Sequence, residues 1–153
     1  MMKKLLLIED DDYKAFQIRD FLEEEGYHVD IRSSFQSGMK TLVSDSYHLL
    51  LLDMSIPTFE TVKSSQNNRY RPFGGVDILK ELQRRELKIP VIVVPQYSVF
   101  GEDRENITRE DLDESLTEQF ESIYQGMVYF DASSLDWTFR LRELLKEAET
   151  YES

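Results

Sequence analysis

The sequence predicts an α/β protein built on one doubly wound parallel sheet, and three observations support this prediction. Short apolar runs alternate with stretches whose apolar residues recur at helical spacing, and this alternation occurs five times along the 153 residues. The run Leu49–Leu52 is apolar without interruption, which is typical of a strand buried on both faces of a sheet. At roughly 150 residues per domain, the length predicts a single domain, residues 1–153, with no attached output domain.

The first half of the chain is expected to supply three strands and two helices. The strands are expected at Leu5–Ile8, Tyr27–Ile31 and Leu49–Leu52. The helices carry apolar stripes at a spacing of three or four residues, and these stripes are Ala15, Ile18 and Leu22, then Phe35, Met39, Leu42 and Val43. Asp11 or Asp12 is expected to cap the first helix, and Gly26 to end it.

The second half is expected to supply three helices and two strands. Gly74 opens the third helix, Thr108 fits the N-cap of the fourth, and Ser133 fits the N-cap of the fifth. The strands are expected at Val91–Val94 and Met127–Phe130. Because β-α-β crossovers are right-handed, five such units predict a flavodoxin-like (βα)5 sandwich with the sheet order 2-1-3-4-5.

The composition excludes several classes of function. The chain has 18 Lys+Arg against 30 Asp+Glu, and its formal net charge of −12 argues against nucleic acid and against anionic membrane surfaces. It has no cysteine and only two histidines, which excludes thiolate chemistry and disfavours a multi-histidine metal site. It contains neither a signal-peptide core nor a membrane-length apolar run, so a cytoplasmic location is expected.

Acidic side chains follow two strands that the sheet order makes neighbours. Glu9, Asp10 and Asp11 leave the first strand, and Asp53 leaves the third. Ligands of such sheets bind beyond the carboxyl ends of the strands, so these carboxylates are expected to converge. Carboxylates this close raise one another's pKa unless a cation intervenes, and hard oxygen ligands suit Mg²⁺. The other interpretation, that the acids only cap the first helix, accounts for Asp11 but leaves Asp53 unexplained.

Three segments of the sequence resemble the receiver domain of two-component response regulators. They are LLLIEDDD at Leu5–Asp12, LLLLDMSIP at Leu49–Pro57, and GGVDILKELQRR from Gly74. The resemblance implies that Asp53 accepts a phosphoryl group from a histidine kinase.

The resemblance also implies a metal site and a switch residue. Glu9, Asp10 and Asp53 would hold Mg²⁺ together with the backbone carbonyl of Ser55. Tyr129 would be the aromatic residue that changes conformation. The other interpretation of Tyr129 is an ordinary strand residue packed against the last helix.

The sequence departs from the family pattern at the positions that contact phosphate. Pro95 stands where the family has Ser or Thr, and Ala132 stands where it has Lys. Shifting the alignment does not restore the lysine, because none lies between positions 126 and 134. Two loops, at about 57–73 and 96–107, exceed the usual length. The first carries three cations that are either substitutes for the missing lysine or solvated charges: Lys63, Arg69 and Arg71.

These features predict a stand-alone receiver-like protein of phosphorelay signalling. The favoured form is a degenerate receiver that acts by protein–protein interaction. The alternative is a working receiver phosphorylated on Asp53. Its partners would be a histidine kinase, a downstream target or both, and it would be a monomer or a weak homodimer. No enzyme activity is expected beyond phospho-acceptor and autophosphatase chemistry, since a haloacid-dehalogenase-like phosphatase needs an acid where Ser55 stands.

Overall fold

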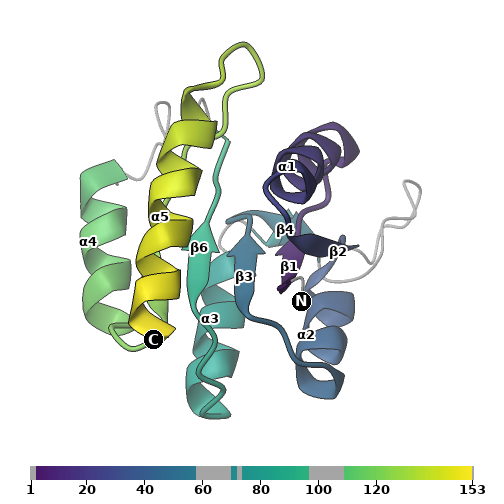
Figure 1. Cartoon of the computed structure of the whole chain (residues 1–153). Helices are drawn as coiled ribbons and strands as arrows, with labels where there is room; N and C mark the ends of the chain where they lie inside the picture. Colours follow the sequence, from purple (N-terminus) through teal and green to yellow (C-terminus); the bar gives the residue numbers. More distant parts are fainter. Residues whose placement is uncertain (1–2, 58–69, 72–73, 97–108, 153) are drawn as a thin grey trace.

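A computed structural model describes residues 3–57, 70–71, 74–96 and 109–152 of the chain (Figure 1). Five parallel strands form a sheet in the order β2-β1-β3-β6-β7, which confirms the predicted order 2-1-3-4-5. The strands are β1 (Lys4–Ile8), β2 (His28–Arg32), β3 (Leu49–Leu52), β6 (Val91–Val93) and β7 (Tyr124–Met127). The helices are α1 (Asp12–Glu24), α2 (Phe35–Ser44), α3 (Gly74–Arg84), α4 (Arg109–Gln119) and α5 (Asp136–Glu152).

The sheet has an apolar core on each face. Successive residues of a strand point to opposite faces, so Leu6 and Leu50 belong to one core and Leu5 and Leu49 to the other. The first core packs against α2, α3 and α4, and the second against α1 and α5. All four residues of β3 are buried, as its uninterrupted apolar run predicts.

The first helix begins and ends where the sequence predicts, and a serine caps the second. The Asp11 side chain caps α1 by accepting the backbone N–H of Lys14 at 3.3 Å. Gly26 follows α1 with a φ of +99°, a conformation that favours glycine. Ser34 caps α2 by accepting the backbone N–H of Ser37 at 3.0 Å. Within the described ranges, no helix is both long enough and apolar enough to cross a membrane.

The fifth strand of the sheet begins earlier than predicted. It was expected at Met127–Phe130, but β7 spans Tyr124–Met127, and only an isolated bridge joins Phe130 to Gln96. Gly126, with a φ of +152°, lies where the register with β6 shifts by one residue. The prediction was wrong because a β-bulge at a glycine interrupts the alternation by which strands are identified.

The start of α5 also differs from the prediction. The Asp131 carboxylate accepts both the backbone N–H and the hydroxyl of Ser133, at 2.9 and 2.7 Å. This turn precedes the helix, which begins only at Asp136, whose N–H donates to the Ser134 hydroxyl. Ser133 is therefore not the N-cap. The cap predicted at Thr108 lies outside the described residues.

A short antiparallel pairing flanks the loop that follows β3. β4 (Ile56–Pro57) pairs with β5 (Tyr70–Arg71), although 57–73 was predicted as an aperiodic polar segment. The two strands have only two residues each, too few to show a period-2 pattern.

Candidate functional site

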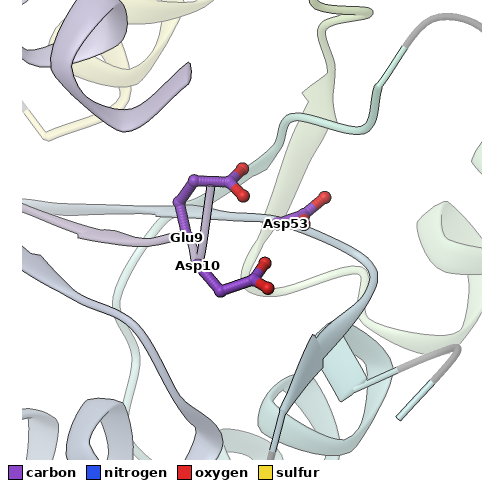
Figure 2. Close-up of side chains that lie close together, drawn as sticks. All are labelled: Glu9, Asp10 and Asp53. Atoms are coloured by element: carbon purple, nitrogen blue, oxygen red, sulfur yellow. The ribbon is translucent and has the colours of Figure 1, made fainter. Parts of the chain in front are cut away.

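Two neighbouring strands deliver three carboxylates to one edge of the sheet. β1 and β3 pair in parallel with Ile8 opposite Leu52, so the residues that follow them emerge side by side. Carboxylate oxygens of Glu9, Asp10 and Asp53 lie within 4.8 Å of one another. Figure 2 shows these three side chains close together. The structure thus brings together three of the four predicted carboxylates, whereas Asp11 caps α1.

Backbone hydrogen bonds fix the positions of these acids. The N–H of Asp53 donates to the carbonyl of Ile8 at 3.1 Å, which extends the β1–β3 ladder to the site. The Asp53 Oδ1 accepts the N–H of Met54 at 2.9 Å, and the Glu9 Oε2 accepts the N–H of Asp11 at 3.1 Å. Both carboxylates are therefore held by the chain that directly follows them.

The start of α3 packs closely against the backbone behind Asp53. The N–H of Gly75 donates to the carbonyl of Met54 at 3.0 Å. A Cβ at position 75 would lie only 2.6 Å from the carbonyl oxygen of Asp53. A glycine is needed here because α3 approaches the Asp53 peptide more closely than a side chain permits.

A buried lysine lies among the carboxylates. Lys14, in the first turn of α1, is only 2% exposed. Its Nζ forms ion pairs with Glu9 Oε1 at 2.7 Å and with Asp53 Oδ1 at 3.2 Å. It also lies 6.0 Å from the centre of the Phe130 ring. Glu9, Asp10, Asp53 and Lys14 together are called the pocket below, and its positive charge comes from α1.

Burial and charge shift the pKa values of this group. The pKa of Glu9 rises from 4.5 to about 8, first because the carboxyl group is buried and then because Asp53 is negative, while Lys14 opposes the rise. Burial lowers the pKa of Lys14, but the charges of Asp53 and Glu9, and hydrogen bonds to them, raise it above its ordinary value. Lys14 is therefore an ammonium ion at neutral pH.

The donor set fits a hard divalent cation. Mg²⁺ prefers oxygen ligands and is commonly held by one or two carboxylates and several waters, which Glu9, Asp10 and Asp53 can provide. Two of these acids also pair with Lys14, so a metal and the ammonium would draw on the same oxygens. A role for the backbone carbonyl of Ser55 stays a prediction.

The predicted phosphate-contacting positions do not supply a side-chain donor. Pro95 is buried just beyond β6, and its carbonyl accepts the N–H of Phe130 at 2.9 Å. Ala132 is exposed in the turn before α5. Tyr129 is half-buried and packs against the core beneath α2, α3 and α4.

The proposed substitute cations fall largely outside the described residues. Lys63 and Arg69 lie there entirely, and for Arg71 only the backbone, in β5, is described. The cation that the structure places beside Asp53 is Lys14, which was not among the predicted site residues.

The sequence nevertheless contains a signal for Lys14. This residue lies four positions before Ile18 and eight before Leu22, so it falls on the buried stripe of α1. A lysine in an apolar stripe, one turn after an acidic cluster, indicates a charge buried with a partner, since lysine is rarely fully buried unpaired.

Comparisons with known proteins point to one family. The model of the response regulator receiver domain matches residues 5–122. The Detocs response regulatory protein DtcB of Enterobacter cloacae is 28% identical over 148 residues, which cover 94% of this chain and 99% of that protein.

Solved structures agree on the fold. A CheY-like receiver domain protein from Methanospirillum hungatei gives a TM-score of 0.63 at 20% identity, over 99% of each chain. The response regulator TrrA of Thermotoga maritima, solved with Mg²⁺ and BeF, gives 0.62 at 20% identity, over 96% of this chain and 99% of that one.

Proposed function

The chain belongs to the receiver-domain family of response regulators in two-component signalling, and on this premise we propose that it is a degenerate receiver that acts by binding other proteins. In such a receiver, a phosphoryl group on the acceptor does not set the conformation in the usual way. The partners would be a histidine kinase, a downstream target or both.

The chemistry of the sheet edge beyond β6 and β7 carries this proposal. Pro95 offers neither a hydroxyl nor an N–H, and its carbonyl is engaged by Phe130. Ala132 is uncharged and exposed. The family resemblance assigns to these two positions the side chains that contact the phosphoryl group, and their absence supports a receiver in which the usual switch is weak.

A working receiver is the second candidate, and the intact acidic cluster favours it. In that case an Asp53 oxygen attacks the phosphorus of a phosphohistidine, the P–N bond breaks, and its electron pair leaves with the imidazole. The product is an acyl phosphate on Asp53. Mg²⁺ held by the acidic cluster would offset negative charge during this transfer. In both proposals the chain has no enzyme activity beyond phosphoryl acceptance and autophosphatase chemistry at Asp53.

Chemical-shift mapping separates the two candidates. Spectra of ¹⁵N-labelled protein are recorded in Mg²⁺ and again after addition of beryllofluoride, with Asp53→Asn as the control. We expect changes near Glu9 and Asp53 but little change at Tyr129 or in α4. Each lost charge-assisted contact is worth roughly 1.5–3 kcal/mol, so two such losses are large enough to remove the coupling of about 1–3 kcal/mol typical of allosteric proteins. Large changes reaching Tyr129 and α4 would favour the working receiver.

A further inference from the structure

We propose that Lys14 is the cation that contacts a phosphoryl group on Asp53, and that it replaces from α1 the lysine that this chain lacks beyond β7. The inference rests on the proposed function in treating Asp53 as the acceptor of a receiver pocket. Lys14 would respond to the charge at Asp53, and α1 is the element that carries Lys14.

The geometry places the Lys14 ammonium beside the acceptor oxygen. Its Nζ hydrogen-bonds to Asp53 Oδ1 at 3.2 Å and pairs with Glu9 Oε1 at 2.7 Å. An ammonium group has three N–H donors, so these two contacts leave one donor for a further oxygen. A group added to Asp53 would bring its oxygens to this donor.

No other cation in the described part of the chain competes for this role. Lys14 is the one lysine or arginine there that forms an ion pair with Glu9 or Asp53. Beyond β7, the apolar Phe130 ring lies over this ammonium, with its centre 6.0 Å from Nζ. The positive charge of the pocket therefore comes from Lys14 on α1 and not from a residue beyond β7.

Burial makes this lysine a fixed part of the pocket. A lysine that is 2% exposed cannot carry its charge into solvent without leaving the protein core. Its backbone is held in the first turn of α1 by the Asp11 cap. A change in the charge at Asp53 therefore acts directly on α1 through Lys14. Among the described residues, no charged side chain of β7 or α4 forms an ion pair with Asp53.

The aromatic neighbours of Lys14 provide a spectroscopic probe. The Phe130 ring contacts the ring of Trp137 at a centroid distance of 5.2 Å, and Trp137 is the only tryptophan of the chain. A rearrangement of the ammonium group against Phe130 can thus be followed through the fluorescence of Trp137.

The test measures beryllofluoride binding in saturating Mg²⁺ for the wild type, Lys14→Met and the control Lys40→Met. Lys40 is exposed on α2, so its variant removes the same charge away from the pocket. Charge-assisted contacts of this type correspond to roughly 10- to 100-fold in affinity. We expect Lys14→Met to bind beryllofluoride that much more weakly, Lys40→Met to match the wild type, and Mg²⁺ alone to bind Lys14→Met as tightly as the wild type or more tightly.

Removal of one partner of a buried ion pair is often strongly destabilising, so Lys14→Met could fail to fold. A second measurement therefore uses the wild-type protein alone. In wild-type protein labelled with ¹⁵Nζ-lysine, the Lys14 ammonium signal is expected to shift when beryllofluoride is added. An unchanged signal at saturation, an unchanged affinity in folded Lys14→Met, or no beryllofluoride binding by the wild type would each overturn the assignment. Large shifts in α4 and at Tyr129 would instead overturn the proposed function, whatever the behaviour of Lys14.

Discussion

The close approach of α3 to the acceptor peptide predicts the effect of replacing Gly75 with alanine. The added Cβ would lie 2.6 Å from the carbonyl oxygen of Asp53 and 3.2 Å from the Cα of Met54, whereas ordinary contacts begin at 3.4 Å. Relief of the shorter contact requires a movement of 3.4 − 2.6 = 0.8 Å between α3 and the backbone. Both obstructing atoms belong to the main chain, so no side-chain rotation can absorb this movement.

The expected cost follows from two opposing effects. Overpacking of this kind costs about 1–3 kcal/mol, and the helix preference of alanine over glycine returns at most about 1 kcal/mol. We expect Gly75→Ala to lower the free energy of unfolding by about 1–2 kcal/mol. Because the displaced peptide carries Asp53, Mg²⁺ affinity should fall as well.

A matched control is Gly38→Ala in α2. A Cβ there would meet the Cδ1 of Ile8 at 2.5 Å, but this atom is the end of a flexible side chain. Urea unfolding of both variants, with metal titration by calorimetry, provides the assay. At a slope of about 1–3 kcal/mol per molar urea, a loss of about 1–2 kcal/mol lowers the midpoint for Gly75→Ala by roughly 0.3–2 M, and the midpoint for Gly38→Ala should fall by less. Equal losses in the two variants, or a Gly75→Ala protein as stable as the wild type, would refute the reasoning.

Two further predictions concern the charges of the pocket. The raised pKa of Glu9, about 8 against 4.5, means that between these pH values the folded protein holds a proton that the unfolded chain releases. Without metal, the free energy of unfolding should then fall by up to roughly 1.4 kcal/mol per pH unit as the pH rises across this window. Glu9→Gln should reduce this pH dependence. Urea unfolding at several pH values measures it, and the same dependence in the wild type and in Glu9→Gln would contradict the prediction. Asp53→Asn should weaken Mg²⁺ or Mn²⁺ binding, and identical calorimetric affinities would remove Asp53 from the metal site.

The sequence was sufficient to predict the sheet order and the acidic half of the site. Leu49–Leu52 is buried throughout, and such a run has few other structural interpretations. Once β1 and β3 are neighbours, the residues that follow them must meet, so Glu9 and Asp53 required no knowledge of side-chain packing. These predictions depend only on the topology.

The parts that were missed depend on packing or on single backbone conformations. The position of β7 depends on the bulge at Gly126, which no periodicity reveals. The role of Lys14 depends on how deeply α1 packs against the sheet, and helix spacing alone gives the face of a residue but not the depth of its Nζ. Helix spacing restricts Lys14 to the buried side of α1, and the tertiary structure then decides which acids it meets.

The position of β1 between β2 and β3 also bears on how the chain folds during synthesis. The ionisable residues of the pocket, Glu9, Asp10, Lys14 and Asp53, all lie within the first 53 residues of the chain. By contrast, β3 acquires its second neighbour only when β6 emerges from the ribosome some forty residues later. Until then, the four leucines of β3 form an open sheet edge, and an unpaired apolar edge strand can pair with another molecule.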